Sequence, residues 1–217
     1  MADDEEAPPQ PVWEGAYDEE GLPHGKGVMK YPPAPVGEDE EEKPGDTYEG
    51  EFAHGKRHGK GKYTWGVSGA VYEGDYAEGA KAGRGRMAYP DKSVYEGEWA
   101  GDVPQGQGTW SYAGGDVYAG ALHGGKRHGR GAYHYRSVGC QLVGEWEEGA
   151  FVRGRWVHKD GSMFSGVFEG GVQPAQGAFF LARPALLQKG SFVGGVWAAG
   201  GDPLVGKIDA LAELAPV

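Results

Sequence analysis

The chain has 217 residues, of which 42 are glycine and 12% are aromatic, and its formal net charge at pH 7 is −11. Collagen is excluded because the glycines follow no three-residue period, and the many aromatic residues argue against disorder. The negative charge argues against binding to nucleic acid or anionic membranes, and a single cysteine, Cys140, excludes an internal disulfide framework. No apolar run reaches the length of about 18 residues that a transmembrane helix needs. We therefore expect a soluble intracellular protein that is dense in turns.

Residues 1–12 open the chain with an acidic, proline-rich segment that we expect to be disordered. Asp3, Asp4, Glu5 and Glu6 give this segment the opposite charge from the basic start of a secretory signal peptide.

An internal repeat fills residues 13–200. Its unit reads aromatic-x-Gly-x-aromatic, a turn, then Gly-x-Gly-x-aromatic-x-aromatic, and the best copy runs from Tyr48 to Trp65. We count seven repeats and one partial repeat, with most copies 22 to 24 residues apart. The copies begin at Trp13, Tyr48, Tyr72, Tyr95, Tyr118, Leu142 and Phe164, and the partial copy covers about Gln188 to Trp197. Such periods are typical of arrays whose units are stable only when stacked.

Alternation within the unit predicts strands. In the best copy, Tyr48, Gly50 and Phe52 share one parity, as do the glycines and aromatics of residues 59–65. We predict strands at 48–52 and 59–65 joined by a connection at 53–58, which makes each repeat a β-hairpin. The predicted fold class is all-β, an elongated twisted single sheet of consecutive antiparallel β-hairpins.

One face of this sheet is predicted to be aromatic. Aligned on the best copy, every aromatic residue except Phe151, Phe180 and Trp197 falls in one of four columns on the same face. Glycines share that face, so that a ring can lie over bare backbone. We expect this face to contact a partner, because a long apolar face is rarely left bare. The candidate partner-binding residues are Tyr48, Phe52, Trp65, Tyr72, Tyr76, Tyr95, Trp99, Trp110, Tyr118, Tyr133, Trp146 and Trp156.

The opposite face is predicted to carry cross-strand charge pairs. Glu49 and Glu51 share it with Lys60 and Lys62. Exposed pairs contribute only about 0–1 kcal/mol each, so they influence register more than stability. The scheme recurs at Glu73, Asp75, Arg84 and Arg86, and at Glu145 and Arg155.

Two segments depart from the repeat. Residues 32–46 interrupt the array with an acidic, proline-flanked loop, which we interpret as solvated, with contact to a basic partner as the alternative. The tail at 201–217 places Leu204, Ile208, Leu211 and Ala215 at helical spacing. This spacing predicts a short capping helix, or alternatively a helix that docks on a partner.

No catalytic, cofactor-binding or metal site is predicted. His54 and His58 are four residues apart, but His24, His58 and His128 recur at the same position of the repeat, which indicates an architectural role. The Gly-x-Gly motifs lack the context of a phosphate-binding loop. No arrangement of nucleophile and base stands out, so we expect no enzyme activity and no cofactor.

Two basic loops offer an alternative function. Lys56 and Arg57, and likewise Lys126 and Arg127, begin basic tracts at the same position of two copies and could bind inositol phospholipid headgroups. The intervening copies interrupt such a stripe, and the net charge opposes it.

The stretch from Tyr48 to Gly61, Tyr-Glu-Gly-Glu-Phe-x-x-Gly-x-x-His-Gly-x-Gly, resembles the MORN repeat. The resemblance covers about residues 13–181, and copies six to eight depart from it, with Val152 at a turn glycine and Pro174 at the histidine.

Within that family, residues 45–65 are similar to the MORN-repeat subunits of the ciliary radial spoke head. This resemblance implies a structural subunit in the axoneme of motile cilia or flagella, part of the cytoskeleton, that meets the central-pair apparatus. The implied partners are other spoke head subunits, including a second MORN protein or a second copy of the chain, and neither nucleic acid nor membrane. The alternative is a phosphoinositide-binding MORN adaptor.

Overall fold

A computed structural model describes residues 9–33, 43–171, 173–183, 185–194, 196–201 and 204–205. These residues form 17 strands and no helix, so the prediction of an all-β array of consecutive antiparallel hairpins is confirmed. Within the same residues, nothing forms a helix long and apolar enough to cross a membrane. The chain divides into two compact units, Met1–Val103 and Pro104–Val217, called unit 1 and unit 2 below.

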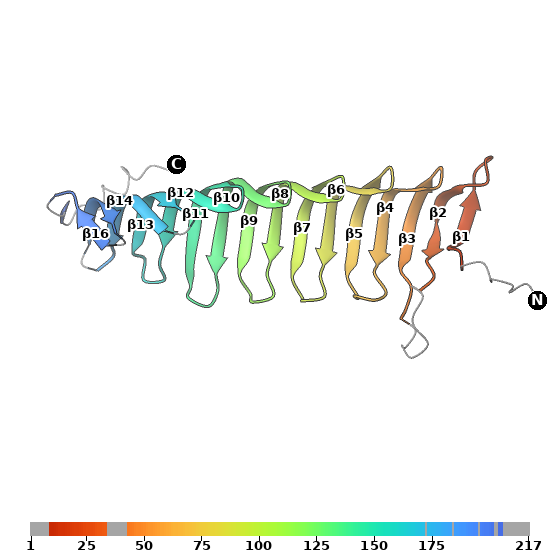
Figure 1. Ribbon diagram of the computed structural model, residues 1–217, viewed down its shortest axis with the longest axis horizontal. Coiled ribbons are helices and arrows are strands. Elements are labelled where there is room, and N and C mark those ends of the chain that lie inside the picture. The colour runs from red at the N-terminus through yellow and green to blue at the C-terminus, as the bar shows by residue number, and fades with distance from the viewer. Residues whose placement is uncertain are drawn as a thin grey trace, which may run out of the picture. The chain divides into compact units, whose positions relative to one another are not determined.

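In unit 1 each strand pairs antiparallel with the next, from β1 to β7 (Figure 1). The strands are β1 (Val12–Tyr17), β2 (Pro23–Lys30), β3 (Thr47–Ala53), β4 (Lys56–Thr64), β5 (Val71–Ala77), β6 (Ala80–Ala88) and β7 (Val94–Ala100).

Unit 2 repeats this pattern from β8 to β16, and β17 pairs with β15 as well. The strands are β8 (Val103–Ser111), β9 (Val117–His123), β10 (Lys126–Tyr135), β11 (Cys140–Glu147), β12 (Ala150–Val157), β13 (Met163–Glu169), β14 (Gln173–Leu181), β15 (Leu186–Val193), β16 (Val196–Ala199) and β17 (Leu204–Val205). Copies six to eight thus form hairpins despite their divergent turns.

The connection predicted at 53–58 was too long. Ala53 pairs with Lys56, so only His54 and Gly55 form the turn. Their φ angles are 47° and 75°, and a two-residue type I′ turn needs positive φ at both positions. The corresponding turns Glu78–Gly79 and Glu148–Gly149 have positive φ at both residues too. Continuous pairing into a tight turn therefore replaces the six-residue loop.

A bulge absorbs the extra residues of the second strand. Gly50 pairs with Gly61 but Glu51 pairs with His58, so Gly59 and Lys60 are left without partners in this hairpin. Gly59 has φ 57°, which favours glycine. Register shifts recur at Gly74/Asp75 and Val167/Phe168. Bulges bend strands and increase their twist, and Figure 1 shows the turn ends of the hairpins curling over.

This bend gives a single layer of strands a core. Tyr48 and Phe52 lie four residues apart, which would separate their Cα atoms by about 13 Å in a straight strand. Their ring centroids nevertheless lie 5.2 Å apart at 87°, and Tyr76 of the next hairpin meets Tyr48 at 5.2 Å and 90°. Tyr72 lies in the same way between Tyr76 and Trp99. Edge-to-face contacts between hairpins thus bury the rings that no hairpin could bury alone.

The glycines allow the rings to lie flat. The Tyr48 hydroxyl and ring occupy the space where a Gly61 side chain would be, and the hydroxyl donates a hydrogen bond to the Glu51 carbonyl at 3.0 Å. The equivalent bonds from Tyr72 to Asp75 and from Tyr95 to Glu98 measure 3.0 and 2.9 Å. The predicted role of glycine as a bare backbone surface under a ring is confirmed for Tyr48, Tyr72 and Tyr118, which lie over Gly61, Gly85 and Gly131.

Two aromatics excluded from the columns pack against other rings, and one of them, Phe151, is a core residue. Phe151 is 0% exposed and contacts Trp146 at 5.0 Å and Phe168 at 4.7 Å. A register shift at Glu145/Trp146 sets Phe151 opposite Trp146, which the alignment of copies could not anticipate. Trp197 packs on Phe179 with a centroid distance of 4.9 Å.

The polar face carries ion pairs, as predicted. Some of these pairs join other residues than the sequence pattern indicated. Lys62 lies opposite Glu49 in the register, as expected. Lys60, by contrast, bonds Asp75 of the next hairpin at 2.6 Å, and Glu51 pairs with Lys26 of the preceding one at 3.6 Å. The bulge explains the difference, because it removes Lys60 from register with Glu51.

Three predicted terminal and loop features fall mostly outside the described residues: the disordered start, the acidic loop and the C-terminal helix. Residues 1–8, 34–42 and 206–217 are not described. The helix prediction is wrong where it begins, since Leu204–Val205 forms β17 against Leu187 and Leu186.

Candidate interaction surface

Much of the predicted aromatic face is core. Tyr48, Tyr72, Tyr95 and Tyr118 are 0% exposed. Phe52, Tyr76, Trp99 and Trp146 of the candidate set are buried as well. Alternation assigned these residues to the correct face, but it could not show that the bent hairpin ends close over them. A partner could reach these rings only if the hairpins opened.

The accessible part of the face is an outer aromatic row of half-buried rings near the strand ends away from the tight turns. It consists of Tyr31, Trp65 and Tyr89 in unit 1, and of Trp110, Tyr112, Tyr133, Tyr135 and Trp156 in unit 2. Trp65, Trp110, Tyr133 and Trp156 were in the predicted set, whereas Tyr31, Tyr89, Tyr112 and Tyr135 were left out of it. All four stand at the last aromatic position of the repeat unit, which Trp65 occupies in the best copy, and this was the signal that could have found them.

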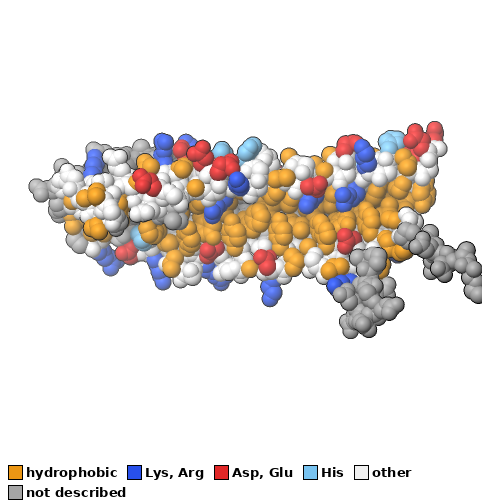
Figure 2. Space-filling view, in the orientation of Figure 1, with side chains coloured by type: hydrophobic (Ala, Val, Ile, Leu, Met, Phe, Trp, Pro, Cys, Tyr) orange, Lys and Arg blue, Asp and Glu red, His pale blue; other side chains and the backbone are white. Residues whose placement is uncertain are grey.

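Contacts among the rings hold the outer row in place. Tyr63 lies 4.6 Å from Trp65, and in unit 2 Tyr112 lies 5.9 Å from Trp110 and 5.7 Å from Tyr133. The Tyr133 hydroxyl donates to Asp116 Oδ2 at 3.0 Å. Figure 2 shows hydrophobic side chains gathered along the strands of each unit, with charged side chains at the margins. The outer row is therefore an ordered apolar surface.

The tyrosine pKa values reflect this packing. Burial raises the pKa of Tyr48, Tyr95 and Tyr118 to about 12. Burial also raises the pKa of Tyr31 and Tyr112 in the outer row above its ordinary value. The tyrosines of both groups remain neutral hydroxyls at physiological pH, which suits contact with apolar or aromatic side chains.

The predicted basic loops are engaged within the fold. The Arg57 guanidinium lies 5.2 Å from the ring centroid of Tyr63 and 5.3 Å from that of Tyr76, and it donates to the Gly79 carbonyl at 2.7 Å. Arg127 makes the equivalent contacts with Tyr133, Trp146 and Gly149. Lys56 and Lys126 pair with Glu78 and Glu148 at 2.7 Å each. The two arginines thus face the aromatic side, and the two lysines have their charge compensated.

Replacing Arg57 with alanine is expected to lower the free energy of unfolding by about 2 kcal/mol, because it removes ring contacts and a charged hydrogen bond. Replacing the adjacent Lys56 with alanine is expected to cost less than about 1 kcal/mol, since its ion pair is exposed. Urea unfolding of both variants, followed by circular dichroism, measures the difference. Equal losses would show that Arg57 does not act as a structural cation.

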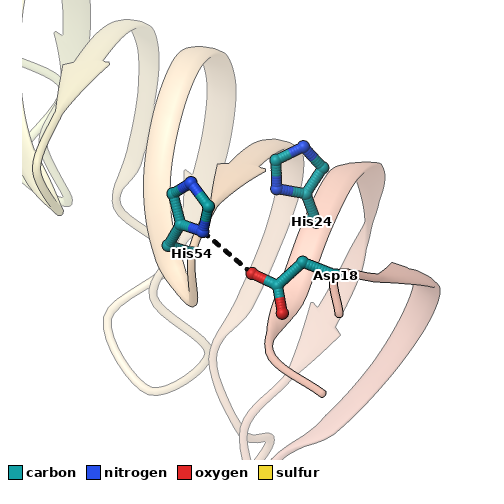
Figure 3. A group of neighbouring side chains, drawn as sticks. All are labelled: Asp18, His24 and His54. Atoms are coloured by element: carbon teal, nitrogen blue, oxygen red, sulfur yellow. Dashed lines mark hydrogen bonds and ion pairs between the residues drawn. The ribbon is translucent and has the colours of Figure 1, made fainter. Parts of the chain in front are cut away.

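The structure also brings together three side chains that the sequence analysis did not connect. Asp18, His24 and His54 lie side by side where the first two hairpins of unit 1 meet (Figure 3). In the sequence, His54 has a histidine nearby at His58, whereas Asp18 and His24 are distant from it. Asp18 and His54 are 36 residues apart, and only the pairing of β2 with β3 brings their turns together.

Comparison with protein families identifies the repeat from which the sheet is built. The family model described as MORN repeat matches residues 14–33, 48–68, 72–94, 95–117 and 118–137. This chain is a MORN-repeat protein. MORN-repeat proteins are generally structural or adaptor proteins without enzyme activity, which indicates a scaffold for protein interaction. The matched segments coincide with the hairpins from β1–β2 through β9–β10, so the repeat unit and the structural unit are the same.

Other comparisons add little to this assignment. No curated protein sequence matches the chain. Among solved structures, it is similar to the SAS-4 (dCPAP) TCP domain of Drosophila melanogaster in complex with a proline-rich motif of Ana2 (dSTIL). That match has 10% identity and a TM-score of 0.31, and it covers 70% of this chain and 81% of the other. It is also similar to the TCP10 domain of Danio rerio CPAP in complex with a peptide of Danio rerio STIL, with 12% identity, a TM-score of 0.34 and 84% coverage of each chain. TM-scores this low do not establish a common fold.

Proposed function

We propose that this MORN-repeat protein is a structural scaffold subunit of the axonemal radial spoke head. The observation that carries the scaffold role is the outer aromatic row, a fixed set of half-exposed rings such as Trp65 and Trp110. Ordered aromatic side chains suit protein contacts, because they bury much area at little cost in conformational entropy. The place in the spoke head rests on the resemblance of residues 45–65 to the spoke head subunits.

Its proposed partners are other spoke head subunits, among them a second MORN protein or another copy of the chain, and through them the central-pair apparatus. The acidic net charge of −11 favours basic partner surfaces around the apolar row. The proposed location is the axoneme of motile cilia or flagella.

Fractionation of cilia tests this proposal. After removal of the membrane with detergent, the protein is expected to stay with the axoneme, and it should be missing from axonemes that lack radial spokes. Recovery in the detergent-soluble membrane and matrix fraction would overturn the assignment, as would normal retention in spokeless axonemes.

The alternative, a phosphoinositide-binding adaptor, has less support. Lys56 and Lys126 are ion-paired, and Arg57 and Arg127 lie over aromatic rings. A headgroup would have to compete with these internal contacts. Salt-sensitive flotation with phosphoinositide liposomes that is lost on replacing Lys56 and Lys126 with alanine would favour the adaptor instead.

A further inference from the structure

Three potential metal ligands converge at the meeting point of the first two hairpins. Asp18 lies in the turn between β1 and β2, His24 lies in β2, and His54 lies in the turn between β3 and β4. One ligand atom from each lies within 4.8 Å of the other two (Figure 3). No other group of three or more His, Cys, Asp or Glu side chains with this property occurs in the part of the chain that the structure describes.

The carboxylate of this group is held in position by the backbone. Asp18 Oδ1 accepts hydrogen bonds from the Leu22 N–H at 2.9 Å and the Glu20 N–H at 3.1 Å. Asp18 Oδ2 is directed at His54 Nδ1, 3.0 Å away. The pKa of Asp18 lies below its ordinary value, mainly because of the Leu22 hydrogen bond, so the group is ionised at neutral pH. Hydrogen bonds that fix a ligating carboxylate are a common support of metal sites.

The turn at His54–Gly55 differs from the equivalent turns of later hairpins in its first residue. Glu78 and Glu148 occupy the first turn position that His54 occupies, with φ angles of 51° and 49° against 47°. Each glutamate reaches back to a lysine of the preceding hairpin at 2.7 Å. His54 likewise reaches back to the preceding hairpin, but its partner is a carboxylate, so both members of the pair are able to bind metal.

A simple ion pair accounts for Asp18 and His54 but not for His24. The His24 ring lies edge-on to the His54 ring, with centroids 5.4 Å apart. Two imidazoles within reach of a carboxylate are a donor set that suits Zn²⁺, whereas Mg²⁺ and Ca²⁺ prefer oxygen ligands alone.

We propose that Asp18, His24 and His54 form a Zn²⁺ site that links the first two hairpins. Zn²⁺ binds nitrogen and oxygen ligands at about 2.0–2.2 Å in tetrahedral geometry, which sets neighbouring donors a little more than about 3 Å apart. Asp18 Oδ2 and His54 Nδ1 lie 3.0 Å apart, a few tenths of an ångström closer than that spacing, so the two atoms separate slightly when the ion binds. His24 is exposed and reaches the ion by rotation of its side chain. Three protein ligands leave a fourth position for water.

The bound ion would clamp the N-terminal end of unit 1. The two turns belong to different hairpins, joined through β2 and β3 and by the Gly55 N–H bond to the Pro23 carbonyl at 3.0 Å. Metal binding to the folded state alone stabilises it by mass action. Zn²⁺ is therefore expected to raise the thermal midpoint of the protein, and a chelator to reverse the rise.

Cobalt absorption spectroscopy on the full, untagged chain tests the site. Co²⁺ is expected to bind with one-to-one stoichiometry and a tetrahedral visible spectrum, and Zn²⁺ to displace it. Changing Asp18→Asn, His24→Gln or His54→Asn should each weaken binding by about tenfold or more. Asparagine suits position 54 because it tolerates the positive φ there. Circular dichroism in the presence of chelator verifies that each variant folds.

A matched histidine in unit 2 provides the control. His123 Nδ1 lies 2.9 Å from the Gln105 amide nitrogen, and the His123 ring lies 5.6 Å from that of His128, so this imidazole is bonded to an amide where His54 is bonded to a carboxylate. His123→Gln is expected to leave Co²⁺ affinity unchanged. The proposal is overturned by an octahedral spectrum, by unchanged affinity in His24→Gln, or by an equal loss in His123→Gln.

Discussion

Replacing Trp99 with alanine is expected to lower the free energy of unfolding by about 3–5 kcal/mol, the usual cost of removing a buried aromatic side chain. Trp99 is 5% exposed and meets the rings of Tyr72 and Tyr95 at 5.2 Å each. Its indole Nε1 donates to the Gly85 carbonyl at 3.1 Å. Lys81 Nζ lies 4.8 Å from its ring centroid. The substitution therefore removes contacts to three strands at once.

Glu98 is the matched control, because it precedes Trp99 on the same strand and belongs to the opposite face. It is half-exposed and lies opposite Arg84 in the pairing of β6 with β7. Replacing Glu98 with alanine is expected to cost less than about 1 kcal/mol. Denaturant unfolding followed by circular dichroism compares the two variants. Losses of similar size would contradict the assignment of the two faces.

Since MORN repeats contact mainly their neighbours, the loss at Trp99 should spread only to adjacent hairpins. Hydrogen exchange would then show faster exchange in β5, β6 and β7, while the amides of β1 remain protected. Uniform loss of protection through unit 1 would indicate that its hairpins unfold as one cooperative body.

The strands, and the face on which each side chain lies, could be predicted from the repeat, because both follow from local alternation. Tyr72, Gly74 and Tyr76 were assigned to one face from parity alone, and all three are buried. Alternation contains no information on bending, so it did not predict that Phe52 closes over Tyr48 and Trp99 over Tyr72. The candidate surface was consequently too broad, and the half-buried outer aromatic row was recognised only in part.

Residues that act across hairpins were the least predictable. Arg57 was interpreted as a loop cation, yet it packs on rings of two hairpins, because it lies opposite Phe52 in the register and so shares the aromatic face. Asp18 meets His54 only through strand pairing between separate copies. Such contacts depend on register, and one residue of slip reverses the direction of every side chain.

Replacing Gly74 with alanine is expected to cost about 2–3 kcal/mol, although it adds only a methyl group. A Cβ atom at Gly74 would overlap the Gly85 Cα atom and would lie 2.6 Å from both the Arg84 carbonyl oxygen and the Tyr72 hydroxyl. The backbone of the paired strand cannot rotate away as a side chain can, so β5 and β6 would have to separate. Thermal and urea unfolding measure the loss.

Gly114 provides the control, because a Cβ atom there meets nothing within 4 Å and its φ is not in the left-handed range. Gly114→Ala is expected to change stability by less than about 0.5 kcal/mol. Adding Tyr72→Phe to Gly74→Ala should not restore stability, since removal of the hydroxyl leaves the overlap with Gly85 and Arg84. Full recovery in the double variant would mean that the Tyr72 hydroxyl, and not the close approach of the two strands, is what requires glycine at this position.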